Sequence, residues 1–240
     1  MDILVREFNT HPCVVHGHGK HDYQYWWEPI KSAFFSAPPA ICSMPAELTI
    51  VTCNNGHRSM GMFERSLDYL GVPYRVFGQG VEPWVNSQAK PAALAAGLRS
   101  IDTDYVLYAD SRDAIIVGDP AVVLERFKEG FSCDMLFGAD RINWPPERQF
   151  ARFEEPLAKQ AGSDYRYLNG GLWIGKTGFC AELFSLAAVT EPVASASESE
   201  QGILKRLFQA HYPRIQLDYC CELFLNTGFL LSREALEIES

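Results

Sequence analysis

Short apolar segments typical of strands alternate with helical segments from about residue 48 onward, and no other feature limits the possible fold as strongly. LTIVTCNN (48–55) is an apolar, β-branched run that ends in polar residues and predicts a buried strand. MGMFERSLDYLGV follows with apolar residues at helical spacing and ends near a glycine. Further predicted strands are PYRVFGQG, DYVLYAD, CDMLFGAD and LNGGLWIGKTG, and further predicted helices are AKPAALAAGLRSI and AVVLERFKEG. This alternation predicts an α/β fold with a mostly parallel central sheet and helices on both faces.

The composition favours one folded domain over residues 1–240. With 47% hydrophobic and 12% aromatic residues and no repeat period, the chain can bury a substantial core, which excludes disordered, collagen-like and coiled-coil proteins. The net charge is −9 and the sequence has no basic block, so we expect no nucleic-acid partner.

Several features predict a soluble, cytoplasmic protein. No apolar run approaches the roughly 20 residues that span a bilayer, and MDILVREFNT has acidic residues where a secretion signal is basic. The seven cysteines have no CxxC spacing, which fits neither a zinc ribbon nor a disulfide framework. We therefore expect mostly free thiols and no membrane span.

Residues 1–47 differ from the alternating core at 48–240. They contain HGHGKH, then the aromatic stretch YQYWWEPIKSAFF and the Pro-rich SAPPAICSMPAE, which is typical of a connector. In HGHGK, the backbone N–H groups of Gly17 and Gly19 can approach a phosphate, Lys20 adds a positive charge, and the His16 imidazole can bind a metal. A His-rich loop without a catalytic role explains the same residues.

An acidic loop follows the predicted strand DYVLYAD. Ligands of open α/β sheets bind beyond the carboxyl ends of the strands, and Asp110 and Asp113 lie at such an end, three residues apart. Both carboxylates can point at one hard cation. Acidic turns without a metal are also common, so the spacing alone leaves both interpretations open.

Polar residues near two other predicted strands are candidates for ligand contacts. Thr52 and Asn54 end the first strand and suit a nucleobase or ribose, although turn chemistry explains them equally well. Lys90 begins a helix and can meet phosphate or solvent. Asn169, Gly170 and Gly171 lie within an apolar strand, where paired glycines indicate a bulge or close approach by a ligand.

Two further residues are candidates for contacts in a ligand-binding cleft. Trp144 in NWPP can stack on a sugar ring or fill the core. Glu200 lies where the helix GILKRLF opens, so it serves either as a helix-terminal polar group or as a carboxylate at a cleft.

In their order along the chain, these segments resemble the glycosyltransferase domain of the procollagen lysyl hydroxylases and their stand-alone relatives. The resemblance covers most of residues 48–227 and implies a nucleotide-sugar-binding fold of the GT-A type. It rests on IVTCNN, FERSLDYLGVPYRVFGQG, QAK at 88–90, YVLYADSRDAIIVGDP, DMLFGADRINWPP, YRYLNGGLWIGKT, SEQGILKRLF and IQLDYCCELFLNT.

The chain departs from the family pattern in two places. Only Glu198 and Glu200 remain of an acidic run that the family has before its Gln. The family ends its domain with a VVHGNG-type phosphate and metal loop, whereas the matching PCVVHGHGK stands here at residues 12–20. The order therefore suggests a circularly permuted domain, with its natural start near Leu48 and residues 1–47 supplying the moved loop and a connector. This hypothesis requires the two chain ends to lie close together and His16 to lie beside the acidic loop.

The resemblance implies a hexosyltransferase that moves glucose or galactose from a UDP-sugar to a hydroxyl group of a glycan or hydroxylated peptide. It implies a metal site of Asp110, Asp113 and His16, a mixed set that suits Mn²⁺, with Mg²⁺ as the alternative. The implied donor contacts are Thr52, Asn54, Lys90, Gly17, Gly19, Lys20, Ser111, Gly170 and Gly171, and the implied catalytic and acceptor-facing residues are Glu200, Asn169 and Trp144. A nucleotide-sugar-binding pseudoenzyme and a metal-dependent nucleotide-sugar phosphohydrolase are the alternatives.

Overall fold

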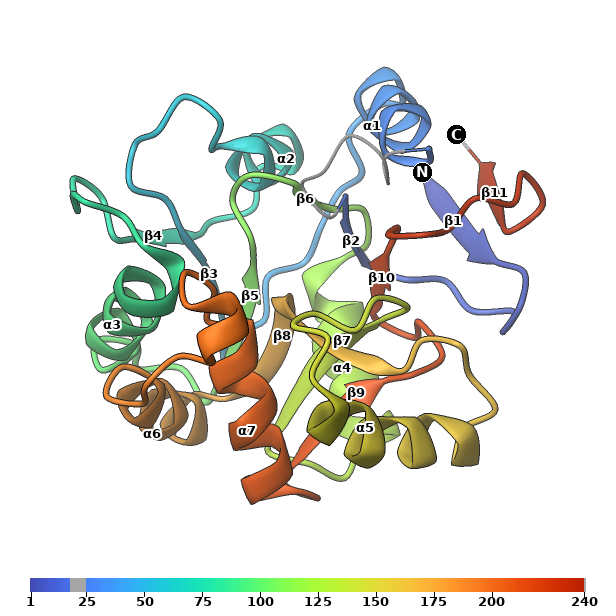
Figure 1. The fold of residues 1–240 in the computed structure, drawn as a ribbon. Helices are drawn as coiled ribbons and strands as arrows, with labels where there is room; N and C mark the ends of the chain where they lie inside the picture. The colour runs from blue at the N-terminus through green and yellow to red at the C-terminus, as the bar shows by residue number, and fades with distance from the viewer. Residues whose placement is uncertain (18–24, 240) are drawn as a thin grey trace.

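The computed structural model describes residues 1–17 and 25–239, and a six-stranded sheet lies at its centre (Figure 1). In spatial order the strands are β4 (Arg75–Phe77), β3 (Leu48–Cys53), β5 (Tyr105–Ala109), β8 (Tyr167–Lys176), β7 (Met135–Asp140) and β9 (Ile215–Asp218). The pairs β3–β4, β3–β5 and β7–β9 are parallel, whereas β8 runs antiparallel to β5 and β7. The prediction of a mostly parallel α/β sheet is confirmed.

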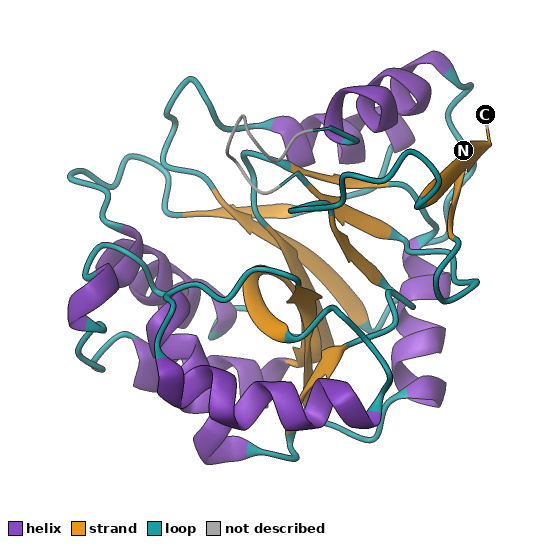
Figure 2. Cartoon of the chain, turned by 45° about the vertical axis from the view of Figure 1, so that its right-hand side comes forward, coloured by secondary structure: helices purple, strands orange, loops and turns teal. Residues whose placement is uncertain are grey.

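Helices cover both faces of this sheet, as predicted (Figure 2). One hydrophobic core joins side chains of the sheet to α3 (Asn86–Leu98), α6 (Thr177–Ala187) and α7 (Gln201–His211). The other core joins the opposite side chains of the strands to α2 (Met62–Leu70) and α4 (Pro120–Gly130). This two-sided burial follows from strands that are apolar at consecutive positions, because neighbouring side chains in a strand point to opposite faces.

The sequence analysis did not predict α6, and it also missed two further helices that complete the domain. Helix α5 (Arg148–Gln160) packs beside α7 and β8. Helix α1 (Trp27–Ser36) occupies most of the aromatic stretch and buries Trp27, Ile30 and Phe34. The irregular connector is therefore limited to the Pro-rich residues 37–47. No helix within the described residues is both long and apolar enough to cross a membrane.

The N-terminal segment joins the domain through two small sheets. Strand β2 (Val14–His16) lies between β10 (Phe224–Asn226), to which it is parallel, and β6 (Ala114–Ile116), to which it is antiparallel. Strand β1 (Asp2–Val5) pairs antiparallel with β11 (Leu236–Glu239), so that Asp2 is the register partner of Glu239. The two ends of the chain therefore lie side by side (Figure 1).

Candidate functional site

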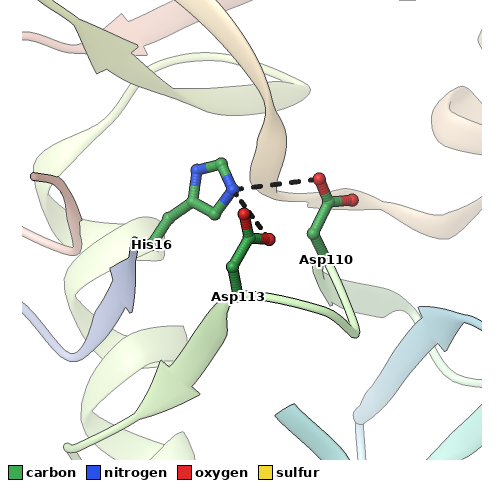
Figure 3. A group of neighbouring side chains, drawn as sticks. All are labelled: His16, Asp110 and Asp113. Carbon is green, nitrogen blue, oxygen red and sulfur yellow. Dashed lines mark ion pairs between the residues drawn. The ribbon is translucent and has the colours of Figure 1, made fainter. Parts of the chain in front are cut away.

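Three potential metal ligands meet beyond the carboxyl end of β5 (Figure 3). Asp110 directly follows β5, Asp113 directly precedes β6, and His16 is the last residue of β2. His16 Nε2 lies 3.2 Å from Asp113 Oδ1 and 3.9 Å from Asp110 Oδ2. One ligand atom from each residue can be chosen so that all lie within 4.8 Å of one another. The expected juxtaposition of His16 with the acidic loop is therefore present.

The strand register explains why His16 reaches the acidic loop. Antiparallel pairing of β2 with β6 sets His16 opposite Ala114, the residue after Asp113. Parallel pairing of β2 with β10 sets His16 opposite Asn226. Since the three strands are consecutive in one sheet, β6 and β10 flank the backbone of His16 on both sides, and His16 is buried.

Asn226 fixes which imidazole nitrogen faces the carboxylates. Its Nδ2 donates to the Ala139 carbonyl at 2.8 Å, so its Oδ1 is left to accept from His16 Nδ1 at 2.7 Å. Nε2 then points toward Asp110 and Asp113. This is the orientation in which a histidine donates through one nitrogen and binds a metal through the other.

Gly171 makes room for the same ring. A Cβ atom at this position would lie 2.7 Å from His16 Cε1, closer than side-chain atoms approach one another. Gly171 also lies in a bulge, because β8 pairs Trp173 with Phe137 but Asn169 with Gly138. The paired glycines therefore mark a bulge and a close approach, as their sequence pattern indicated, and here the approaching group is His16.

The electrostatic environment of His16 favours its charged form in the absence of a metal. Burial alone lowers the pKa of the imidazole, but the carboxylate of Asp113, and then that of Asp110, outweigh burial and raise the pKa to about 9. A proton on Nε2 thus occupies the direction in which a cation would bind.

Lys90 connects Asp110 to Glu200 instead of projecting toward solvent. Its Nζ donates to Asp110 Oδ1 and to Glu200 Oε1, each at 2.7 Å. Tyr108 also donates to Asp110 Oδ1, at 2.6 Å. Burial lowers the pKa of Lys90, but the two carboxylates together raise it above its usual value. The solvent alternative for Lys90 is therefore not supported, because Asp110 and Glu200, directly before α7, hold the ammonium. The expected contact of Lys90 with a nucleotide stays a prediction.

The side chains of this group carry a negative balance among themselves. The carboxylates of Asp110, Asp113 and Glu200 face the ammonium of Lys90 and the charged imidazole of His16, so three negative charges meet two positive charges. Asp110 is the most accessible of them, with 29% of its side chain exposed. The group is thus built to attract a cation from the adjoining space.

A cavity of about 400 Å³ adjoins Asp110 and Asp113. Its wall includes the Trp84 indole, the Arg112 side chain, and the polar turn that follows β3. Aromatic and guanidinium planes beside a polar turn can hold a flat heterocycle and a sugar. Trp84 was not identified from the sequence because it belongs to no spaced motif, and Arg112 was given no role although it lies between Asp110 and Asp113.

Three side chains that were expected to contact the nucleotide form hydrogen bonds within the protein. Thr52 is fully buried and donates to the Ala109 carbonyl at 2.7 Å, so its side chain cannot reach a ligand. Asn54 donates to Glu64, and its own oxygen accepts from the Gly56 N–H in the turn. Ser111 donates to Glu64 and accepts from the Gly61 N–H at the start of α2. These contacts replace the expected ligand contacts of Thr52 and Asn54, whereas Ser111 also belongs to the wall of the cavity and its ligand contact stays a prediction.

The expected phosphate contact of Gly17 is also corrected. Its N–H donates to the Asp113 carbonyl at 2.6 Å, which extends the β2–β6 ladder by one bond. A Cβ at Gly17 would lie 2.5 Å from the Trp27 ring, so glycine is needed there for packing. Gly19 and Lys20 lie outside the described residues.

The strand β8 brings Asn169 and Gly170 to the other side of Glu200. Asn169 donates to Asp140 Oδ2 at 2.8 Å and accepts from the Gly171 N–H. The Gly170 N–H donates to Gln201 Oε1, and a Cβ at Gly170 would lie 3.8 Å from Glu200 Oε1. Glu200 therefore faces the bulge of β8 and the Lys90 ammonium together.

Trp144 lies farther along the same edge, on the loop between β7 and α5, and is 42% exposed. A partly exposed ring can contact an incoming ligand, so the core alternative for Trp144 is not supported.

Comparison with known proteins gives two findings. The family model described as the PLOD GT domain matches residues 45–239. Procollagen-lysine,2-oxoglutarate 5-dioxygenase 1 of Homo sapiens is 24% identical over 191 residues, which cover 74% of this chain and 25% of that protein. The chain thus corresponds to about a quarter of the length of this curated relative.

Proposed function

The chain belongs to the PLOD GT domain family, a family of glycosyltransferase domains, and from this premise we propose that it transfers a hexose from a UDP-sugar to a hydroxyl group in a metal-dependent reaction. UDP-glucose and UDP-galactose are the proposed donors, and the acceptor is a glycan or a hydroxylated peptide.

One observation carries the proposal: ligand atoms of His16, Asp110 and Asp113 converge within 4.8 Å beside a cavity large enough for part of a nucleotide. Two carboxylates and an imidazole form a donor set that suits Mn²⁺, and Mg²⁺ is the alternative. The fit is supported by Asn226, which turns His16 Nε2 toward the carboxylates. When bound, such a cation supplies positive charge that stabilises the diphosphate leaving group.

The residues of the chain divide the remaining tasks. The uridine binds in the cavity beside Trp84 and Arg112. The side chains of Thr52 and Asn54 do not contact it, because they form hydrogen bonds within the protein. Lys90 holds Asp110 and Glu200 in fixed positions. Glu200, Asn169 and the glycines of the β8 bulge shape the sugar pocket, and Trp144 faces the acceptor.

We also propose that the domain is circularly permuted relative to its family. The family match starts at residue 45, so β2 and its His16 lie before the matched region. Strand β2 nevertheless inserts between β6 and β10, which lie within the match, and β1 pairs with β11 at the far end. A rearranged gene that starts at Pro45 and carries residues 2–44 after Ser240 should therefore fold and keep the activity. Loss of folding in that protein would contradict the permutation.

The activity itself is tested by a thermal-shift screen of UDP-sugars with and without Mn²⁺. A bound donor should stabilise the folded state by about 2.7 kcal/mol at a hundredfold excess over Kd. Product analysis with and without candidate acceptors then distinguishes transfer from hydrolysis, since hydrolysis releases free hexose without an acceptor. Absence of Mn²⁺-dependent stabilisation by any UDP-sugar would contradict the proposal.

A further inference from the structure

A second buried lysine lies next to the Trp144 loop. Lys205 of α7 has no exposed surface, and its Nζ donates to Glu154 Oε2 of α5 and to Asn143 Oδ1 of the loop, each at 2.8 Å. The rings of Tyr167 and Phe150 lie 5.0 Å and 5.4 Å from the ammonium. Asn143 directly precedes Trp144.

Glu154 extends this network to β8. Its second oxygen accepts from the Leu168 N–H at 2.8 Å, next to Asn169. Asn169 in turn donates to Asp140, whose Oδ1 accepts from the Ile142 N–H at the start of the same loop. The loop and the strand that shapes the proposed sugar pocket are therefore held by one set of polar contacts.

Helix α7 contacts the loop on both sides of Trp144. Asn143, before it, is held by Lys205, and Pro145, after it, lies against Gly202. A Cβ at Gly202 would lie 3.3 Å from Pro145 Cγ and 2.5 Å from Val193, so glycine permits this approach. The same helix begins directly after Glu200. Trp144 and Glu200 are thus positioned by one rigid element.

A buried ion pair is a costly way to stabilise a fold, since apolar side chains of similar volume often serve as well. Its advantage is geometric, because directed hydrogen bonds select one arrangement of the groups that they join. We propose that Lys205, through Asn143, is a positioning residue that holds Trp144 in place for the acceptor. This inference rests on the proposed function for the acceptor role of Trp144, but the positioning of the indole can be measured without it.

The test compares Asn143→Ala with Asn143→Asp, whose carboxylate can still accept from Lys205. The fluorescence of Trp144 is obtained as the difference between each variant and the same variant carrying Trp144→Phe. We expect red-shifted emission and stronger acrylamide quenching in Asn143→Ala, and wild-type behaviour in Asn143→Asp. Gln149→Ala, at an exposed position of α5, is the matched control and should change nothing.

Kinetics with Mn²⁺ and UDP-galactose or UDP-glucose complete the test, with lactose and a hydroxylated peptide as acceptor probes. Asn143→Ala should raise the acceptor KM about fivefold, equivalent to one hydrogen bond of about 1 kcal/mol, and leave the donor KM and the hydrolysis rate unchanged. The double variant Lys205→Met/Glu154→Gln should have the same effect, since Gln keeps the contact with Leu168.

Unchanged Trp144 emission, an unchanged acceptor KM, or equal effects on the donor and acceptor KM in Asn143→Ala would each overturn the positioning role. If the wild type transfers no hexose to either probe, the proposed function fails, and the fluorescence of Asn143→Ala alone decides whether Asn143 fixes the indole.

Discussion

Lys90 and Lys205 are both buried lysines with a glutamate partner, yet their surroundings differ in charge. Lys90 lies between Asp110 and Glu200, and the carboxylates raise its pKa despite burial. Lys205 meets one carboxylate and one amide, and burial lowers its pKa despite Glu154. Burial also raises the pKa of Glu154. In the second pair, burial therefore outweighs the attraction of the oppositely charged partner for both groups.

The difference separates a site from a scaffold. Around Lys90 the carboxylates exceed the ammonium and border a cavity, which suits binding of a further cation. Around Lys205 one positive charge matches one negative charge, and both side chains are at most 1% exposed. We propose that a ligand completes the first arrangement, whereas the second is complete within the protein.

Replacing each lysine by methionine tests the difference between the two lysines and has the largest expected effect. Lys205→Met leaves the Glu154 carboxylate buried without its partner and should destabilise the fold by about 3–5 kcal/mol. Lys90→Met should also destabilise the fold, but Mn²⁺ should recover part of that loss because a cation replaces charge beside Asp110. Chemical denaturation with and without Mn²⁺ measures both, and an equal response of the two variants to Mn²⁺ would remove the distinction.

Removing a metal ligand should affect metal-dependent binding more than the stability of the fold. Asp113→Ala should weaken Mn²⁺-dependent UDP binding by roughly a hundredfold or more, since even groups that only orient ligands contribute 10–100-fold. Its melting temperature without metal should fall at neutral pH, because Asp113 is the main partner of the charged His16 imidazole, and this difference from the wild type should shrink as the pH rises above about 9. Calorimetry measures the binding of UDP with Mn²⁺, and EDTA should abolish this binding in the wild type. Asp102→Ala, at an exposed position, is the control. Undiminished binding in EDTA would refute the metal site.

Loss of the residue that orients His16 should have a smaller effect. Asn226→Ala removes the acceptor of His16 Nδ1 and should lower Mn²⁺ affinity roughly 10–100-fold. Thr227→Val is the control, because that hydroxyl contacts the His16 carbonyl and not its ring. Equal affinities in the two variants would show that Asn226 does not set the imidazole.

The smallest expected effect is that of a change of one pH unit on metal binding. The pKa of His16 is raised from 6.5 to about 9 in the metal-free protein, so a cation must displace a proton at neutral pH. Mn²⁺ affinity should therefore rise with pH by up to about tenfold per unit below pH 9.

The same shift links pH to the stability of the metal-free protein. The contribution of protonated His16 is fully present below pH 6.5 and is lost as the pH rises through about 9. The proton displaced by the metal is counted by titration calorimetry in buffers of different ionisation enthalpy. Metal binding without proton release would contradict His16 as a metal ligand.

The sequence was sufficient for the parts of the fold that depend on local pattern. Apolar runs predicted β3, β5 and β7, and helical spacing predicted α2, because burial of these segments is continuous or periodic. The acidic loop was found because it follows such a strand. Placing His16 beside it required the family resemblance, since β2 has only three residues and its partners are distant in sequence.

The errors at the site have a common cause. Thr52 and Asn54 are polar residues at a strand end, and sequence alone does not show that Ala109 and Glu64 satisfy them internally. Lys205 was missed for the converse reason: in an amphipathic helix a lysine is expected on the solvent side, and its partners lie 51 and 62 residues away. Which polar groups meet is decided by tertiary packing.

The position of β2 between β6 and β10 has a consequence for synthesis of the protein. His16 leaves the ribosome 210 residues before Asn226, the asparagine that orients it. Strand β2 can pair with β6 once residue 116 has been made, but its other edge must wait until β10 has been made. Nascent or truncated chains should be unable to assemble the three-ligand cluster in its native geometry, so high-affinity metal binding would report that translation has passed Asn226.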